Sequence, residues 1–207
     1  MSSDREPQVL QAIQDRQSSR KFSNTPVSRA SVRRILNAAR LAPSGANQQP
    51  WRFVVIDDLD VKRDLRACCE VAEVSHHENV RGDLRAWFDA HSITSSKSFL
   101  EDAPVLIATF FDAHAPYPIP SVWIAITHML LQITEEGLYS LPYTPSGAKL
   151  GSLLGIPERY RLAAIVPIGY ADQPPRQPRL PLSSIVSLNQ FGRPFPEEQE
   201  IERSEDC

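Results

Sequence analysis

Hydrophobic residues recur along the chain at spacings that predict both helices and strands. Apolar side chains three and four positions apart predict an amphipathic helix over Ser28–Leu41, with Ser28 suited to the N-cap. Trp51–Ile56 and Pro104–Phe111 are short apolar runs that predict strands, and the second should be buried on both faces. The most apolar segment, Ser121–Leu138, predicts a helix with too few polar positions for a surface, so it belongs in a core or a subunit interface.

Weaker patterns complete the predicted order of elements. A first helix is expected over Pro7–Gln17. Two polar helices near Val61–Ser75 and Val80–His91 have modest apolar stripes, so they should lie on the surface or form a lid. A short helix over Ala148–Leu154 and a strand over Leu162–Ile168 follow. Few strands among many helices favour a single α+β domain.

The end of the chain differs in composition from the rest. The sequence has 18 prolines and only 8 glycines, and many of the prolines follow Gly169. Proline lacks a backbone N–H and fixes φ, so this stretch cannot be regular helix or central strand. We therefore expect one folded domain over residues 1–170 and, over residues 171–207, an extended arm that wraps over another surface, such as a second subunit.

Composition and charge narrow the function classes. The 207 residues are 42% hydrophobic and 23% charged, close to the average for globular proteins. A formal net charge of −3 gives no positive field for nucleic acid or an anionic membrane, and no apolar run reaches the roughly 20 residues that cross a bilayer. The first residues lack the pattern of a secretory signal, and 3 cysteines, two of them adjacent, make a poor disulfide framework. We expect a cytoplasmic protein.

Several polar clusters are candidates for chemistry. Arg16 and Arg20 are four positions apart and would share a helix face, with Ser18 between them. Two guanidiniums and a hydroxyl can hold a phosphate, although a solvated helix end would have the same residues. The loop Pro43–Pro50 (PSGANQQP) offers hydroxyls and amides that could read a planar ring edge, or could simply join a helix to a strand. No histidine has a partner at a familiar metal-ligand spacing, so no metal is expected.

Two other stretches could each contribute a single group. Thr144 lies in a proline-bounded loop and could donate a hydrogen bond to a cofactor or substrate, or could satisfy local backbone. Arg176 and Arg179 could reach an anion bound elsewhere, or could solubilise the arm. The absence of GxGxxG, GxxxxGK[ST] and GxSxG argues against a dinucleotide fold, a phosphate-loop NTPase and a nucleophile-elbow hydrolase.

As an ordered set, these segments resemble the FMN-dependent nitroreductase superfamily. The set is an Arg-x-Ser-x-Arg-x-Phe run, Pro-Val, a helix, APSGANQQPW and a strand, and it extends from Ile13 to Val186. Within the superfamily, APSGA, LLGIP and PIGY with a later R-x-P-L are similar to the iodotyrosine deiodinase branch. The resemblance implies a central, mostly antiparallel sheet flanked by helices, and an intertwined homodimer with two FMN sites at its interface.

The resemblance also implies roles for individual residues. The Arg-x-Ser-x-Arg segment and a tail arginine would hold the phosphate and pyrimidine of FMN, the PSG segment would pack on the ring, and Thr144 would act at the flavin N5 atom as the catalytic side chain. The residues implied to bind FMN are Arg16, Gln17, Ser18, Ser19, Arg20, Pro43, Ser44, Gly45, Asn47, Pro142, Tyr143, Thr144, Pro145 and Arg179. Those implied to bind substrate are Ala46, Glu73, His77 and Lys97.

The predicted lid departs from the deiodinase pattern. Deiodinases grip an amino-acid zwitterion with Glu, Tyr and Lys; here Lys97 matches the lysine, Glu73 matches the glutamate after a one-residue shift, and His77 falls at or near the tyrosine. A carboxylate-bearing aromatic could still pair with Lys97. The resemblance implies that NAD(P)H supplies electrons to FMN and that a small electron-poor aromatic (nitro, quinone or halogenated) accepts them. Alternatives are reductive dehalogenation of halotyrosine-like or halophenol substrates, FMN binding without turnover, and flavin degradation.

Overall fold

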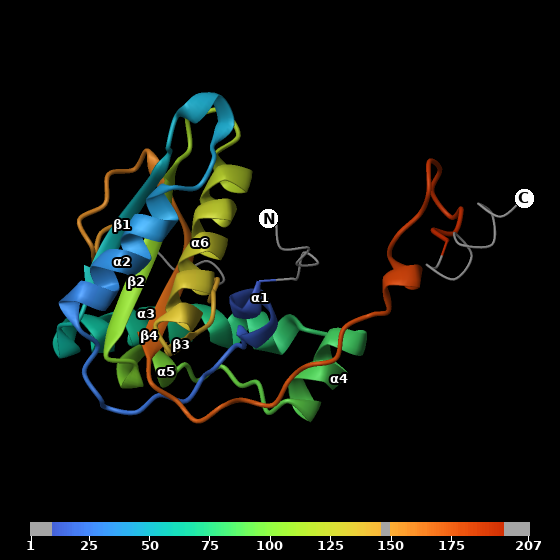
Figure 1. Ribbon diagram of the computed structural model, residues 1–207. Coiled ribbons are helices and arrows are strands. Elements are labelled where there is room, and N and C mark those ends of the chain that lie inside the picture. The colour runs from blue at the N-terminus through green and yellow to red at the C-terminus, as the bar shows by residue number, and fades with distance from the viewer. Residues whose placement is uncertain (1–9, 146–149, 197–207) are drawn as a thin grey trace, which may run out of the picture. The chain divides into compact units, whose positions relative to one another are not determined.

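A four-stranded antiparallel sheet forms the centre of the fold (Figure 1). The computed structural model describes residues 10–145 and 150–196. The strands are, in chain order, β1 (Trp51–Ile56), β2 (Val105–Asp112), β3 (Tyr139–Ser140) and β4 (Tyr160–Gly169). They lie in the order β1-β2-β4-β3, and each neighbouring pair is antiparallel. The prediction of an α+β fold with a mostly antiparallel sheet is confirmed.

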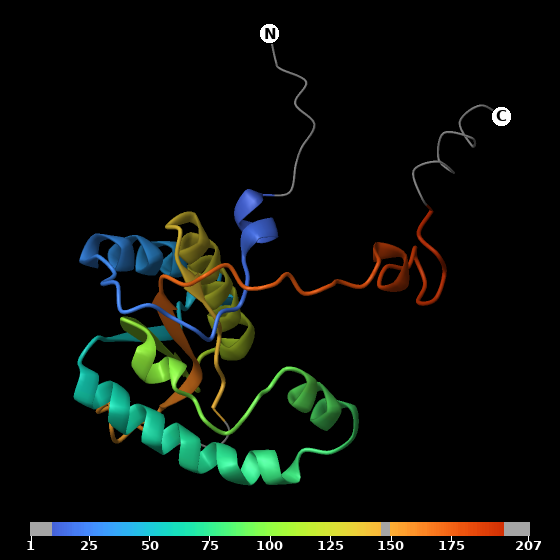
Figure 2. The ribbon, with the colours of Figure 1, turned by 90° about the horizontal axis from the view of Figure 1, so that it is seen from below.

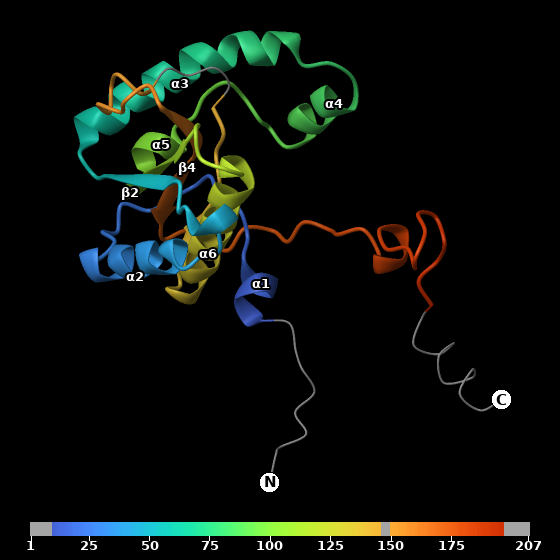
Figure 3. The ribbon, with the colours of Figure 1, turned by 90° about the horizontal axis from the view of Figure 1, so that it is seen from above.

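Helices cover both faces of this sheet. They are α1 (Gln11–Asp15), α2 (Arg29–Arg40), α3 (Leu59–Asn79), α4 (Gly82–Ala90), α5 (Phe99–Asp102) and α6 (Pro118–Glu135). Figure 2 shows α2 and α6 on one side of the sheet and α3 and α5 on the other. Helix α4 buries none of its residues, and Figure 3 shows it apart from the sheet. None of the helices in the described part of the chain is long and apolar enough to cross a bilayer.

The side chains of β2 alternate between two hydrophobic cores. Ile107 packs with residues of α2 and α6, whereas Leu106, Ala108 and Phe110 pack with residues of α3 and α5. Neighbouring β4 follows the same rule, so both central strands are buried on both faces. This explains why β2 is almost continuously apolar in sequence.

The N-terminal segment is held along the β3 side of the sheet. Its backbone donates hydrogen bonds from Ser19 N to Ser140 O at 3.2 Å and from Ser23 N to Tyr170 O at 2.8 Å. Phe22 and Pro104 both pack on Gly169, where an added Cβ would lie 2.7 Å from Cδ of Pro104 and 3.1 Å from the ring carbon Cδ1 of Phe22. A glycine is therefore needed at the end of β4 for this close approach.

The structure corrects several predicted boundaries. The described part of the first helix ends at Asp15, so the prediction that helix continues to Gln17 is wrong. Helix α3 extends to Asn79, beyond the predicted Ser75. Of the predicted helix Ala148–Leu154, residues 148 and 149 lie outside the described residues and the described remainder forms turns. Neither α5 nor β3 was predicted, because four residues and two residues are too short to show a periodic pattern.

The chain divides into two units, Met1–Pro174 and Pro175–Cys207. In the described part of the second unit, the only helical segment is a single 3₁₀ turn at Leu182–Ser184. A bridge between Ser187 and Pro194 closes a short loop. The irregular backbone follows from the prolines, and the wrapping of a partner subunit by this arm stays a prediction.

Candidate functional site

A cavity of about 480 Å³ opens between α3, α4 and the loop after β3. Seven residues predicted for the site line it: Arg20, Glu73, His77, Lys97, Pro142, Tyr143 and Thr144. They come from four separate parts of the sequence, and the fold brings these parts together around one cavity. Apolar side chains, among them Phe88, Ile93 and Phe99, complete the wall. The cavity combines a hydrophobic wall with a few polar groups, as small-molecule sites do.

The polar centre of the cavity is the carboxylate of Glu73. The phenol of Tyr143 donates a hydrogen bond to its Oε1 at 3.0 Å. Its Oε2 lies 3.4 Å from Lys97 Nζ and 3.5 Å from His77 Nε2. The side chains of Glu73 and Lys97 are only 6% and 7% exposed, so this ion pair is shielded from water. A buried ion pair is retained only where its members are well paired, because each charge is costly to desolvate.

Helix α3 places Glu73 and His77 on one face, since they are four residues apart. Cys69 lies one turn earlier on the same face, and burial raises the pKa of its thiol to about 12, so it is a neutral group beneath Tyr143. Burial also raises the pKa of Tyr143, which keeps its phenol protonated as a donor. His77 packs against Phe88 of α4 with ring centroids 5.0 Å apart, and burial lowers its pKa. The ring is therefore neutral at pH 7.

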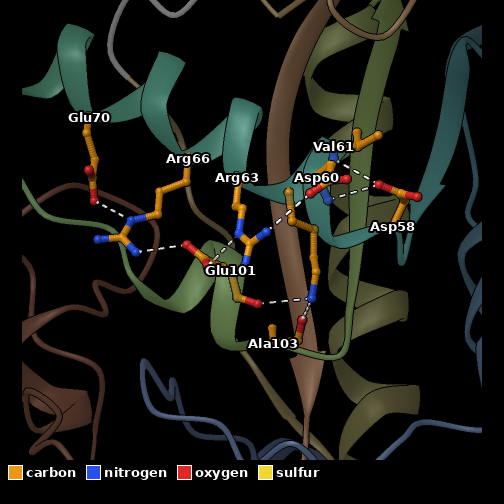
Figure 4. Close-up of polar contacts among 9 residues, drawn as sticks. Asp58, Asp60, Val61, Arg63, Arg66, Glu70, Glu101 and Ala103 are labelled. Atoms are coloured by element: carbon orange, nitrogen blue, oxygen red, sulfur yellow. Dashed lines mark hydrogen bonds and ion pairs between the residues drawn. The ribbon is translucent and has the colours of Figure 1, made fainter.

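An ion-pair network joins α3 to α5, which begins two residues after Lys97 (Figure 4). Arg63 and Arg66 of α3 both reach the carboxylate of Glu101 in α5, at 3.2 Å and 3.0 Å. Arg66 also pairs with Glu70 at 2.8 Å. Glu70 in turn accepts the backbone N–H of Lys97 at 2.7 Å. These contacts explain how a lysine outside any helix is held opposite Glu73.

Residues 16–20 reach the site as extended chain. The prediction that Arg16 and Arg20 share a helix face is wrong, because Ser18 forms a parallel bridge with Ser140 and the segment continues the sheet edge. In extended chain every second side chain points the same way, which again puts Arg16, Ser18 and Arg20 on one side. Arg16 Nη1 lies 3.4 Å from Ser18 Oγ, and Arg20 lines the cavity. The three side chains thus lie on one side of the segment, as expected, but because of the two-residue repeat of extended chain and not because of a helical turn.

The two intervening residues, Gln17 and Ser19, have other surroundings. Gln17 lines a second cavity of about 290 Å³, and both amide atoms of its side chain are buried without a hydrogen-bond partner among the described residues. Ser19 is buried, and its hydroxyl donates to Lys21 O at 2.9 Å. Their predicted contacts with FMN stay predictions, and the local bond to Lys21 commits the Ser19 hydroxyl to its own segment.

The PSG loop lies away from the cavity in the same chain. Gly45 N donates to Ser121 Oγ at 3.2 Å, in the first turn of α6, and Figure 1 shows the loop beside that end of the helix. None of the described residues that line the cavity belongs to Pro43–Asn47. An added Cβ on Gly45 would lie 2.8 Å from Cδ2 of Tyr117, so the close approach that this glycine permits is to its own chain. Ser44 Oγ accepts from Gln49 N at 3.0 Å.

The remaining predicted residues lie in less informative surroundings. Ala46 has φ 48° within the PSG loop, and Pro145 ends the described part of the loop after β3. Arg179 belongs to the second unit, where its Nη1 lies 3.3 Å from Pro178 O. In the described residues, His, Cys, Asp and Glu form no group of three suited to a metal ion.

Some members of the site were missed by sequence reasoning. The pairing of Tyr143 with Glu73, the Cys69 thiol beneath it and Phe88 beside His77 were not expected. A four-residue spacing of Cys69, Glu73 and His77 was available as a signal for one shared helix face. The partner of that face, 70 positions from Glu73, had no local signal.

Comparisons with known proteins establish the family of the chain. Residues 13–170 match the Nitroreductase family. An iodotyrosine deiodinase of Thermotoga neapolitana is 43% identical over 158 residues, which are 75% of this chain and 84% of that protein. One of Haliscomenobacter hydrossis is 33% identical and the match covers 79% of each chain. A crystal structure of oxidized iodotyrosine deiodinase bound to FMN and 3-iodo-L-tyrosine superposes with a TM-score of 0.82 at 39% identity, over 87% of this chain and 98% of that chain. The chain belongs to the nitroreductase family.

Proposed function

We propose that this protein is an FMN-dependent oxidoreductase that removes a halogen from a small aromatic substrate, with NAD(P)H as the electron donor. The observation that carries the proposal is the cavity that joins Arg20 and Thr144 to the buried pair of Glu73 and Lys97. Relatives named iodotyrosine deiodinase, one of them solved with FMN and 3-iodo-L-tyrosine, favour dehalogenation over nitro or quinone reduction.

The residues present fit the phosphate of FMN. Arg16, Ser18 and Arg20 lie on one side of an extended segment, and together they offer two guanidiniums and a hydroxyl for charge-assisted hydrogen bonds. Thr144 is exposed in the cavity wall, where its hydroxyl can donate to the flavin ring. Arg179 is the further phosphate ligand that the proposal assigns to the arm. When bound, FMN supplies the redox chemistry, and the protein supplies orientation and electrostatics.

The overall reaction balances without an acid or base from the protein. An aryl halide and NAD(P)H give the arene, NAD(P)⁺ and halide: the hydride contributes the electron pair of the new carbon–hydrogen bond, and the pair of the broken carbon–halogen bond leaves with the halide. The chain's own groups bind the substrate and exclude water. Phe88 and Phe99 offer apolar surface to a flat ring, and the Thr144 hydroxyl holds a proton at the cavity edge.

We further propose that each FMN lies between two copies of the chain. The PSG loop contacts the start of α6 and residues 16–20 pair with Ser140 just beyond its end. A helix of 18 residues is about 27 Å long, much longer than the fused rings of a flavin. One ring can therefore touch both segments only if they come from different chains. Trp123 and Ile124 of α6 are 36% and 37% exposed, which leaves apolar surface for a partner.

The experiment is flavin retention by Arg16→Ala, Arg20→Ala double-variant protein. We expect purified wild-type protein to carry FMN and the double variant to lose most of it, with an affinity reduced at least tenfold. Arg33→Ala, Arg40→Ala on α2 removes the same charge away from the cavity and should retain FMN. Equal flavin content in the two double variants would contradict the phosphate site. Light scattering of the wild-type protein checks for two chains per particle, and flavin absorbance checks for one FMN per chain.

A further inference from the structure

We propose that the cavity selects an aromatic without an amino-acid group, such as a halophenol, because Glu73 is already neutralised by groups of the protein. This inference rests on the proposed function and names its substrate class. A zwitterionic substrate needs a free carboxylate for its ammonium and a free cation for its carboxylate. The structure has both groups in the cavity, but pairs them with each other.

Two groups of the protein, Tyr143 and Lys97, pair with the carboxylate of Glu73. Tyr143 donates to Oε1 at 3.0 Å, and Oε2 faces Lys97 Nζ at 3.4 Å. His77 Nε2 lies 3.5 Å from Oε2 but makes no hydrogen bond to it. With its side chain only 6% exposed, the carboxylate has little surface left for a ligand. A substrate ammonium would have to displace one of these donors.

Lys97 is similarly committed. Its Nζ donates to the carbonyl oxygen of Thr94, faces Glu73 and lies 5.9 Å from the centre of the Tyr143 ring. The backbone N–H of Lys97 is tied to Glu70, so the residue is held from two ends. A substrate carboxylate that approached Lys97 would bring a second negative charge beside Glu73 in a buried site, which is unfavourable.

The other groups of the cavity do not change this balance. Among the described residues that line it, Arg20, Glu73 and Lys97 carry the charges besides the two histidines, His76 and His77, and the proposed function assigns Arg20 to FMN. His77 is neutral because burial lowers its pKa. With Glu73 and Lys97 cancelling, the space beside the phenyl rings of Phe88 and Phe99 suits an uncharged ring. Displacing a buried partner leaves it unpaired, whereas a ring without charges displaces none.

The test compares two ligands on the FMN-loaded protein that differ only in the amino-acid group. Quenching of flavin fluorescence measures the affinities of 2-iodophenol and 3-iodotyrosine. We expect the phenol to bind at least tenfold more tightly. Tighter binding of 3-iodotyrosine would overturn the inference and leave the proposed function standing. Failure of the protein to hold FMN, or to bind either aromatic, would overturn the proposed function itself and the inference with it.

A variant that gains affinity for 3-iodotyrosine would show which contact of Glu73 excludes the amino-acid group. Tyr143→Phe keeps the ring but removes the hydrogen bond to Glu73, so the ratio of affinities should shift at least threefold toward 3-iodotyrosine. Tyr160→Phe is the matched control, because Tyr160 lies in β4 outside the cavity, and its ratio should not change. An unchanged ratio in Tyr143→Phe would overturn the role given to this phenol.

A second variant covers the case in which Tyr143→Phe does not fold. Glu73→Gln keeps the shape of the side chain but removes the charge that pairs with Lys97. A ligand with a carboxylate and no ammonium, 3-(4-hydroxy-3-iodophenyl)propionate, should then bind at least tenfold more tightly than to the wild-type protein, while 2-iodophenol should change little. No gain for the carboxylate would overturn the neutralisation of Lys97 by Glu73.

Discussion

The carboxylate of Glu70 accepts the backbone N–H of Lys97 at 2.7 Å. Helix α3 therefore holds Lys97 at two points, its backbone through Glu70 and its side chain through Glu73. Glu73 lies one helical turn from Glu70 on α3. Burial raises the pKa of Glu70, but the hydrogen bond from Lys97 and the pairing with Arg66 outweigh it and hold the pKa below its usual value. The ionised carboxylate is therefore the form that organises this part of the site.

Replacing Glu70 by alanine should loosen the segment around Lys97. Without its acceptor, the Lys97 amide loses its hydrogen bond and should exchange with solvent at least tenfold faster. Hydrogen–deuterium exchange of the peptide that contains Lys97 gives the measurement. Glu78→Ala, at an exposed position of the same helix, is the control and should leave that peptide unchanged. Equal exchange in both variants would contradict the positioning role of Glu70.

Lys62 should contribute measurably to the free energy of unfolding. Its buried Nζ donates to the carbonyl oxygens of Glu101 and Ala103, each at 2.9 Å, and so attaches α3 to the chain before β2. Lys62→Met keeps the apolar stem but leaves both carbonyls without this donor, which should cost about 2 kcal/mol. Urea unfolding measures the difference. Arg63→Met, whose side chain is 54% exposed, should cost under about 1 kcal/mol, and an equal cost for both would refute the assignment.

Gly45→Ala should destabilise the fold through a contact with Tyr117. The added Cβ would lie 2.8 Å from Tyr117 Cδ2, closer than such atoms normally come, and the expected cost is about 1–3 kcal/mol. Tyr117→Ala removes that ring, so the same glycine substitution should cost less in the Tyr117→Ala background. Thermal unfolding of the wild-type protein, the two single variants and the double variant measures the difference. A cost independent of residue 117 would place the strain elsewhere.

The pair of Arg34 and Glu136 should make stability depend on pH in the acid range. The Arg34 guanidinium donates to Glu136 at 2.6 Å and lowers the pKa of that carboxyl to about 2. Since the pKa is depressed in the folded state, the stabilisation is complete above the usual value near 4.5 and is lost as pH falls toward 2. Wild-type protein should be more stable than Glu136→Gln by about 1 kcal/mol at pH 6, with a gap that narrows below pH 4.5 and closes only near pH 2. A gap of constant size would rule out this titration.

Local patterns were sufficient for most of the fold. The spacing of Val32, Ile35 and Ala39 follows one helix face, and all three are buried in α2. The continuous apolar run of β2 reflects helices on both sides of the sheet, as expected. These elements could be predicted because their side-chain periods arise from contacts repeated along the element itself.

The parts that could not be predicted depend on distant partners. Residues 16–20 have a helical neighbour, but pairing of Ser18 with Ser140 draws them into extended chain. The contact between Glu73 and Tyr143 spans 70 positions, and no local period reports it. Glu73, His77 and Lys97, which were predicted to bind substrate, line one cavity, and their contact with a substrate stays a prediction.

The separation of the PSG loop from residues 16–20 along α6 has a consequence for mixtures of damaged chains. A chain altered at Arg20 and a chain altered at Ser44 would each be inactive with copies of themselves. In the proposed dimer of the two chains, one composite centre inherits both lesions and the other inherits none. Co-expression should therefore restore up to half of the native turnover per pair, an interallelic rescue that a centre built within a single polypeptide would never show.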